Sequence, residues 1–106
     1  MKEMALPNVF LSKPIAHRGL HSIDEGRPEN SMAAIQAAVE HGYGIEIDLQ
    51  LTRDNKALVF HDYELSRLTR ERGAVRQRMA SDLTSIALTG GKAGPPLLAE
   101  VLETVQ

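Results

Sequence analysis

The fold is decided by the stretch Ile45-Glu46-Ile47-Asp48-Leu49-Gln50-Leu51, in which apolar and polar side chains alternate strictly. Successive side chains of a β-strand point to opposite faces, so this pattern predicts one continuous strand over 45–51. One face would carry the four apolar residues, and the other face would carry the three polar ones.

The residues after this stretch predict a hairpin. Residues 53–56 are typical of a turn, and the apolar run 57–60 predicts a second strand that leads into His61 and Asp62. A hairpin centred between Asp54 and Asn55 would place His61 directly across from Asp48. The connection is too short for the crossover helix that joins parallel strands.

The residues before the stretch predict a strand and a helix. Residues 14–18 form a short, largely apolar strand that ends in a turn, and residues 32–41 are rich in good helix formers. Asn30 or Ser31 would cap this helix. Its apolar face would include Ile35, Ala38 and Val39. Residues 1–13 are expected to be an irregular lead-in, and residues 14–106 to be part of one domain.

The remainder of the chain predicts an arginine-rich segment over 65–78, a short helix that begins at Ser81 and a further helix over 97–105. A loop around Pro95 and Pro96 separates the two helices. The order of strand, helix, strand and later helices is typical of an α/β protein.

Composition narrows the functional classes. The chain has 106 residues and a formal net charge of −2, which argues against nucleic-acid binding and against a polybasic membrane face. Because it has no cysteine, disulfides, thiolate metal sites and a cysteine nucleophile are excluded. The longest apolar run near the start, residues 9–11, is too short for a signal peptide or a membrane span. We therefore expect a soluble, cytoplasmic protein.

The carboxylates of Glu46 and Asp48 allow two interpretations. On an antiparallel strand, alternate acidic residues commonly form a solvated face. They could also bind a hard cation such as Mg²⁺ or Ca²⁺, because side chains at positions i and i+2 lie roughly 7 Å apart along a strand.

Further polar residues follow the other strands. His17 and Arg18 end the first strand, and His61 ends the strand over 57–60. An arginine can bind a phosphate with two parallel hydrogen bonds, and a pair of imidazoles can move protons on and off reacting oxygens. A lone histidine is usually structural, but together these groups suit the cleavage of a phosphodiester.

Four motifs resemble the glycerophosphodiester phosphodiesterase family. They are Ile15-Ala16-His17-Arg18-Gly19, Pro28-Glu29-Asn30-Ser31, the stretch 45–54 and Val59-Phe60-His61-Asp62. Leu65, Arg67 and Thr69 also match. The resemblance covers 14–69 and, more loosely, 81–104. Ser31 stands where the family usually has Thr, and Leu97 and Ala99 replace the family's usual Thr and Glu.

The resemblance implies a role for each matching residue. His17 and His61 would be the general acid–base pair, and Arg18 would contact the substrate phosphate. Glu46 and Asp48 would bind a divalent metal, Mg²⁺ or Ca²⁺. Glu29 would line the site, although an acidic residue before a helix cap also has an electrostatic role. The substrate would be a small glycerophosphodiester, hydrolysed to glycerol 3-phosphate and an alcohol.

The resemblance also implies a (β/α)8 barrel, which typically needs about 250 residues. In that barrel the strands over 45–51 and 57–60 would both belong to the wall and be joined by an irregular link, so the hairpin and the barrel arrangement stay open as alternatives. These 106 residues would supply its N-terminal portion only, without the strand that carries a third acidic metal ligand. We therefore expect a fragment that is inactive by itself. Two alternatives stay open, a phospholipase-like activity of the same barrel superfamily and a non-catalytic remnant. The absence of an exposed apolar stretch would favour a small soluble substrate.

Overall fold

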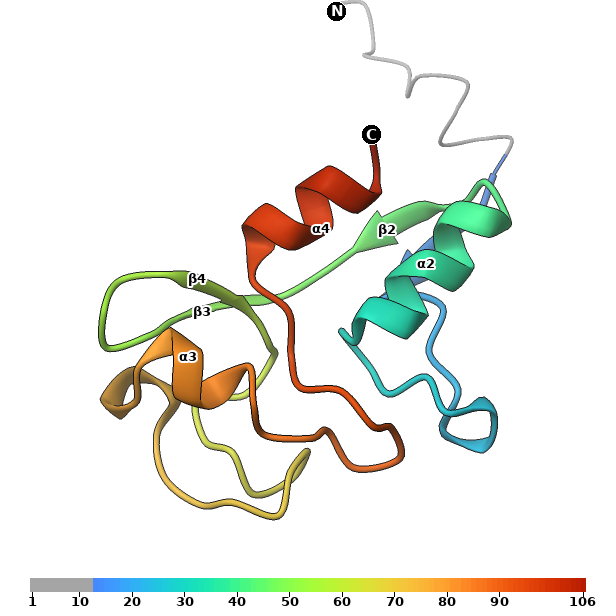
Figure 1. Ribbon diagram of the computed structural model, residues 1–106. Helices are drawn as coiled ribbons and strands as arrows, with labels where there is room; N and C mark the ends of the chain where they lie inside the picture. The colour runs from blue at the N-terminus through green and yellow to red at the C-terminus, as the bar shows by residue number, and fades with distance from the viewer. Residues whose placement is uncertain (1–12) are drawn as a thin grey trace, which may run out of the picture.

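The computed structural model describes residues 13–106, so the lead-in expected over 1–13 lies, except for Lys13, outside the described residues. The strands are β1 (Ile15–His17), β2 (Gly44–Glu46), β3 (Leu49–Leu51) and β4 (Ala57–Val59). The α-helices are α2 (Met32–Glu40), α3 (Ala80–Leu83) and α4 (Leu98–Thr104), and the short 3₁₀ helices are η1 (Ile23–Glu25) and η2 (Val75–Gln77). Figure 1 shows their arrangement. Within 13–106, no helix is both long and apolar enough to cross a bilayer.

The first part of the fold is a β–α–β unit. Strands β1 and β2 pair in parallel, with Ala16 opposite Ile45 and His17 opposite Glu46. Helix α2 is the crossover between them, as parallel pairing requires. Because the strands are parallel, their carboxyl ends meet at the same edge, where His17 and Glu46 lie side by side.

Helix α2 begins where the sequence predicts. The Ser31 hydroxyl accepts a hydrogen bond from the Ala34 N–H at 3.1 Å, so Ser31 rather than Asn30 caps the helix. The face that contains Ala34, Ile35 and Ala38 is buried. Val39, which we expected on the apolar face, is 41% exposed, so the buried face of the helix is turned away from it.

The prediction of one strand over 45–51 is wrong, because the stretch divides at Ile47 and Asp48 into β2 and β3. The cause lies in β1. Arg18 and Gly19 have left-handed φ values of 57° and 76°, so β1 turns away after His17 and β2 loses its partner after Glu46. A side chain at Gly19 would also collide with α2, since its Cβ would lie 2.9 Å from the Ala34 Cβ.

The hairpin is confirmed, but its register differs from the expected one. Strands β3 and β4 pair antiparallel, with Leu49 opposite Val59 and Leu51 opposite Ala57. Beyond the strands, the Phe60 N–H donates to the Asp48 carbonyl at 2.9 Å. The residue across from Asp48 is therefore Phe60, and the prediction that His61 lies directly opposite Asp48 is wrong by one position.

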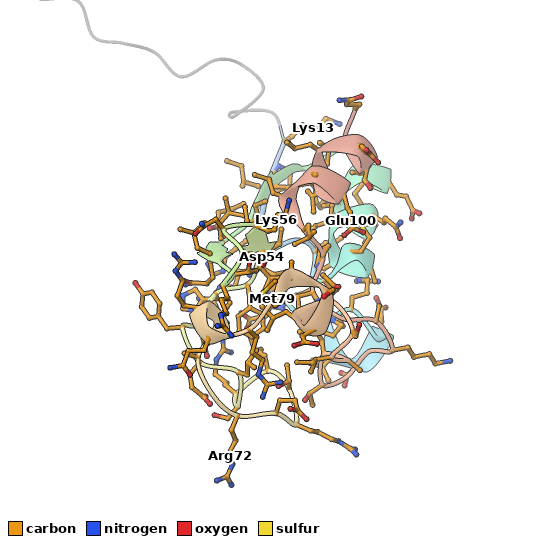
Figure 2. The ribbon with its side chains drawn as sticks, turned by 60° about the vertical axis from the view of Figure 1, so that its left-hand side comes forward. Lys13, Asp54, Lys56, Arg72, Met79 and Glu100 are labelled. Carbon is orange, nitrogen blue, oxygen red and sulfur yellow. The ribbon has the colours of Figure 1, made fainter. Side chains whose placement is uncertain are left out.

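The turn of the hairpin is fastened to α3. The Asp54 carboxylate accepts hydrogen bonds from the Thr52 hydroxyl at 2.6 Å and from the Ala80 N–H at 2.9 Å. Figure 2 shows Asp54 beside Met79, the residue that precedes α3. Hydrogen bonds from Thr52 and from the Ala80 backbone hold the pKa of Asp54 below its usual value. The turn residues thus also provide the N-terminal cap of α3.

Strand β4 separates two apolar clusters. Leu58 and Phe60 contribute to the first cluster, which also contains Leu65, Val75, Leu83 and Leu88. Val59 points the other way, into a smaller cluster with Ile35 and Val101. Helix α4 contacts both β4 and α2, and it lies between the hairpin and α2 in Figure 1. The alternation along β4 therefore explains why one strand serves both clusters.

The alternation in β3 does not bury its apolar side chains. Leu49 and Leu51 are 45% and 51% exposed, and Tyr63 nearby is 82% exposed. Ile45 and Ile47, by contrast, pack against the cluster of Ile35, Val59 and Val101. The expectation that this sequence has no exposed apolar stretch is therefore wrong, and it gives no support to the choice of a small soluble substrate.

Candidate active site

The end of β1 presents the first two predicted site residues. The backbone N–H of Arg18 donates to Glu46 Oε1 at 3.1 Å, and His17 Nε2 lies 3.7 Å from the same oxygen. The left-handed turn at Arg18 brings its N–H to that carboxylate. The His17 side chain is 67% exposed, so it is accessible to a ligand.

The two acidic residues of the divided stretch lie around Arg18. Asp48 Oδ2 is 3.6 Å from Arg18 Nε and accepts a hydrogen bond from Asn30 Nδ2 at 3.1 Å. Within 13–106, the second oxygen of each carboxylate, Glu46 Oε2 and Asp48 Oδ1, accepts no hydrogen bond. Each acidic residue thus keeps one oxygen for a ligand.

Asn30 is a further candidate site residue that the sequence alone does not indicate, because an asparagine at this position is typical of a helix cap. It is buried, with 1% exposure, and it has a left-handed φ of 58° that asparagine tolerates well. Its side chain donates to Asp48 Oδ2 and accepts from the Asp48 N–H at 3.3 Å. The Pro-Glu-Asn motif was the available signal for this role.

His61 follows β4 and is oriented by its neighbour. The His61 ring Nδ1 lies 2.7 Å from Asp62 Oδ1, and Gln50 Nε2 donates to the His61 carbonyl at 2.8 Å. Arg67 holds Asp62 through two hydrogen bonds, of 2.8 and 3.0 Å. Arg67 matches the family resemblance, but the sequence alone predicts no role for it.

Glu29 lies between two arginines. Arg18 Nη1 donates to Glu29 Oε2 at 3.0 Å, and Arg67 donates to both Glu29 oxygens at 2.9 and 3.0 Å. The Glu29 side chain is only 12% exposed. An unbroken series of contacts therefore joins five of the predicted site residues to Asp62 and Arg67: His17, Arg18, Glu29, Glu46 and Asp48. It continues through Asp62 to His61.

The electrostatics follow from these contacts. Burial raises the pKa of Glu29, but hydrogen bonds and positive charge from Arg67 and Arg18 outweigh it, and the net pKa is below its usual value. Hydrogen bonds from Arg67 lower the pKa of Asp62 to about 2, with a further contribution from His61. The hydrogen bonds that Arg67 donates to Asp62 and to Glu29 stabilise its charged form and raise the pKa of Arg67. Both carboxylates are therefore ionised at neutral pH.

The ligand atoms that the site offers are of the kind that a hard divalent cation prefers. Glu46 and Asp48 offer carboxylate oxygens, the ligands that Mg²⁺ and Ca²⁺ prefer. Among residues 13–106, however, no three acidic, histidine or cysteine side chains gather closely enough to hold a metal by themselves. These two carboxylates thus fit part of a coordination sphere.

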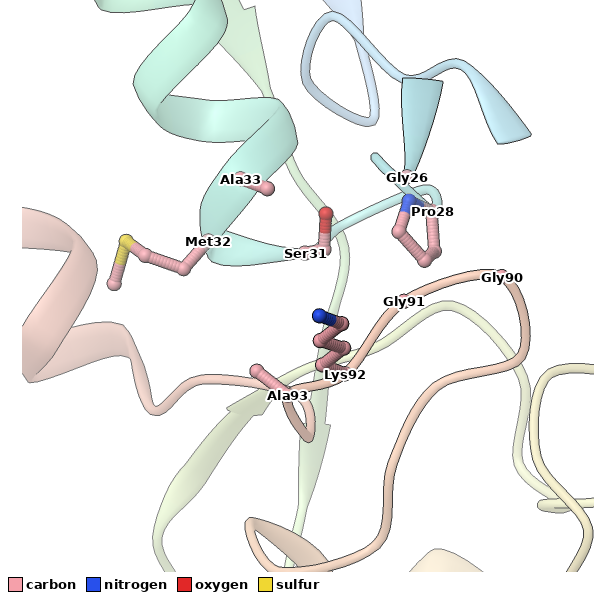
Figure 3. Close-up of a pocket in the computed structure, with 9 residues that line it drawn as sticks. All are labelled: Gly26, Pro28, Ser31, Met32, Ala33, Gly90, Gly91, Lys92 and Ala93. Atoms are coloured by element: carbon pink, nitrogen blue, oxygen red, sulfur yellow. The ribbon is translucent and has the colours of Figure 1, made fainter. Parts of the chain in front are cut away.

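A pocket of about 500 Å³ lies elsewhere, between the start of α2 and the loop that contains Gly90 and Gly91. Figure 3 shows Lys92 extending across it toward Ser31. None of the predicted site residues lines it. The strand-end cluster, rather than this pocket, is the candidate active site.

Comparisons with known proteins agree with this architecture. The chain is 38% identical over 102 residues to a glycerophosphodiester phosphodiesterase of Bacillus altitudinis, over 90% of this chain and 40% of that protein. It is 46% identical over 61 residues to a human lysophospholipase D, over 57% of this chain and 18% of that protein. The chain therefore spans less than half the length of these relatives.

Solved structures share the fold. An Oleispira antarctica phosphodiesterase, determined with the product sn-glycerol-3-phosphate, matches with a TM-score of 0.77 and 30% identity, over 92% of this chain and 41% of that one. The expected fold class, the N-terminal portion of an α/β barrel of the (β/α)8 type, is confirmed. The model of the glycerophosphoryl diester phosphodiesterase family, a family of phosphoric diester hydrolases, matches residues 17–106. This chain belongs to that family.

Proposed function

We propose that the complete natural protein containing these residues hydrolyses glycerophosphodiesters to glycerol 3-phosphate and an alcohol. The observation that carries this proposal is the convergence of His17, Arg18, Glu46 and Asp48 at the ends of β1 and β2, linked by direct contacts to His61 at the end of β4. The product bound to the Oleispira phosphodiesterase supports a small glycerophosphate compound as the substrate class.

Arg18 would bind the substrate phosphate. Its Nη1 is fixed by Glu29, whereas its buried Nε has no hydrogen-bond partner within 13–106. A buried donor without a partner is costly, and a phosphate oxygen would satisfy it with a charge-assisted hydrogen bond. The weak contact to Asp48 at 3.6 Å leaves this nitrogen free to turn to a ligand.

His17 and His61 would transfer the protons. The contact between His61 Nδ1 and Asp62 leaves Nε2 as the ring nitrogen that can accept or donate a proton at the substrate. One imidazole would take a proton from the attacking water, and the other would give a proton to the leaving alcohol. Both rings are more than 40% exposed, at 67% and 43%, so a substrate can reach them.

A divalent cation, Mg²⁺ or Ca²⁺, would be held by Glu46 and Asp48 and by ligands from outside the described residues. When bound, it would offset the negative charge on the phosphoryl oxygens. Asn30 would keep the Asp48 carboxylate in place through the hydrogen bond to Oδ2, so that Oδ1 faces the cation.

A second candidate is a lysophospholipase D activity. It is favoured by the 46% identity to the human lysophospholipase D. Assays with glycerophosphocholine and lysophosphatidylcholine in parallel separate the two, because only the second substrate has an acyl chain.

Residues 1–106 by themselves would be inactive. They supply two carboxylates for the metal, and Ile15, Leu49 and Leu51 each expose about half of their surface. Exposed apolar strands invite pairing with other chains. We expect the isolated 106 residues to aggregate or melt without cooperativity and to show no chelator-sensitive hydrolysis.

Substitution of the histidines tests the proposal in the complete protein. His17→Ala and His61→Ala should each lower turnover of glycerophosphocholine by roughly a hundredfold or more, because each removes a positioned proton-transfer group. His41→Ala is the matched control, since within 13–106 its ring hydrogen-bonds to the Ala37 carbonyl of α2 and packs against Tyr43, away from the candidate site. Near-normal turnover in either His17→Ala or His61→Ala would refute the acid–base assignment.

A further inference from the structure

Arg67 contacts both the part of the site that follows β1 and the part that follows β4. Its guanidinium donates two hydrogen bonds to Glu29, at 2.9 and 3.0 Å, and two to Asp62, at 2.8 and 3.0 Å. Glu29 lies 38 positions earlier in the sequence, in the loop before α2, whereas Asp62 follows β4. One side chain thus ties together the connections that follow β1 and β4.

Each carboxylate that Arg67 holds also holds a residue proposed to act on the substrate. Glu29 Oε2 accepts from Arg18 Nη1 at 3.0 Å, and Asp62 Oδ1 lies 2.7 Å from His61 Nδ1. Arg67 is therefore linked through Glu29 to Arg18, the proposed phosphate-binding residue, and through Asp62 to His61, a proposed proton-transfer group. It contacts neither directly.

We propose that Arg67 is a positioning residue, which fixes the His61 ring through Asp62 and the Arg18 guanidinium through Glu29. The inference deepens the proposed function and rests on it. Without Arg67, Glu29 would have Arg18 as its one arginine partner and would draw that guanidinium away from the phosphate. Asp62 would lose two of the hydrogen bonds that keep it against His61.

The chemistry of the guanidinium explains why this position suits arginine. A planar fork with five N–H donors can form a pair of parallel hydrogen bonds with each of two carboxylates, and Arg67 uses this capacity with four bonds. A lysine ammonium is a single point charge with three donors and cannot hold both carboxylates in this way.

If Arg67 had a purely structural role, its loss would lower the melting temperature more than the turnover. The Arg67 side chain is 49% exposed, and ion pairs of this kind usually add little to stability. A residue that acts through position should therefore affect turnover far more than melting temperature. Arg70 is a matched control, because it lies in the same segment, is exposed and has no side-chain hydrogen bond or ion pair within 13–106.

The experiment compares Arg67→Met, Arg67→Lys and Arg70→Met in the complete natural protein, with glycerophosphocholine as substrate. Arg67→Met should lower kcat/KM by roughly tenfold to a hundredfold, a cost that misplaced reacting groups can cause, with only a small fall in melting temperature. Arg67→Lys should stay within about threefold of Arg67→Met, because it restores the charge but not the fork. Arg70→Met should retain full activity. Wild-type kcat/KM in Arg67→Met, or full recovery in Arg67→Lys, would overturn the inference.

Double-mutant cycles trace the route. If Arg67 acts through Asp62 and Glu29, then Arg67→Met should cost less in the background of Asp62→Asn or Glu29→Gln than in the wild type. Equal costs in all three backgrounds would show that Arg67 acts through neither carboxylate, and the inference would fall.

The ¹⁵N signals of the His61 ring give a readout that does not need activity. At mildly alkaline pH, wild-type His61 should be the tautomer with the proton on Nδ1, donated to Asp62, and Arg67→Met should shift it toward a mixture. An unchanged His61 spectrum in Arg67→Met would overturn the inference whether or not the protein is active. A wild-type protein without hydrolysis would refute the proposed function alone, and the ring signals would still decide the role of Arg67.

Discussion

The parallel pair β1–β2 and the hairpin β3–β4 come from similar apolar runs but serve different purposes. In the parallel pair, Ala16 is buried while Ile15 is 51% exposed, and the carboxyl ends carry His17, Arg18 and Glu46. In the hairpin, Leu58 and Val59 of β4 are fully buried, whereas Leu49 and Leu51 of β3 are about half exposed. Strand β4 of the hairpin and the clusters around it therefore supply much of the apolar packing, whereas the parallel pair mainly positions the polar residues of the candidate site. Asp48 lies at the junction of the two.

The largest expected difference between the regions is in stability. Leu58→Ala should lower the free energy of unfolding by about 2–5 kcal/mol, because it leaves a cavity in a fully packed cluster. Ile15→Ala in the parallel pair should cost about 1 kcal/mol or less, since half of that side chain is already in water. Chemical denaturation of the complete protein measures both. Equal losses would show that the two regions contribute alike.

A smaller effect is expected at the junction, in metal affinity. Asp48→Asn should weaken Mg²⁺ or Ca²⁺ binding by at least about tenfold, because it removes one formal charge from the proposed hard-cation site. Asp24→Asn, at an exposed position in η1, is the control and should bind normally. Calorimetric titration with each metal measures the affinity. Unchanged binding in Asp48→Asn would remove Asp48 from the metal site.

The N-terminal cap of α2, the crossover helix of the parallel pair, is expected to contribute about 1 kcal/mol to the free energy of unfolding. Ser31→Ala should destabilise the protein by this amount, because the Ala34 N–H loses its acceptor. Ser31→Thr, which keeps a hydroxyl at the cap, should retain most of the stability. A melting curve of Ser31→Ala that coincides with the wild-type curve would show that the cap contributes nothing.

The smallest effect concerns pH and the contacts that join the two regions. The folded-state pKa of Asp62, about 2, is below its ordinary value of 3.8, and that of Glu29 is also lowered. The stability that these two ionised carboxylates add to the folded protein is therefore complete at pH values above their ordinary pKa values, and it is lost as the pH falls toward 2. Melting temperatures between pH 6 and pH 2 should fall less steeply for Asp62→Asn than for the wild type. Parallel profiles would contradict the lowered pKa of Asp62.

The sequence predicted the local elements well, because caps and periodicity are local signals. Helix α2, a cap at either Asn30 or Ser31 and the antiparallel hairpin all follow from neighbouring residues, and the structure selects Ser31. The division of 45–51 could not be predicted in this way. It depends on where β1 ends, and therefore on the left-handed turn at Arg18 and Gly19, nearly thirty residues away. Alternation shows that a segment is extended but not which strand is its partner.

The site shows the same limit. The strand-end residues could be chosen from their positions, and the family resemblance gave them roles. Asn30, Asp62 and Arg67 were missed as partners because their significance lies in contacts across the fold, such as Arg67 to Glu29. An arginine in a charged segment is usually solvated, so composition alone does not distinguish Arg67 from Arg70.

We propose that the strand-end cluster catalyses metal-dependent hydrolysis of a phosphodiester. The most direct measurement follows glycerophosphocholine and the complete natural protein by ³¹P NMR, first with a chelator and then with added Mg²⁺ or Ca²⁺. We predict that glycerol 3-phosphate is formed only when the metal is present and that His61→Ala forms almost none. Hydrolysis that continues undiminished in the chelator, or that His61→Ala catalyses as well as the wild type, would contradict the claim.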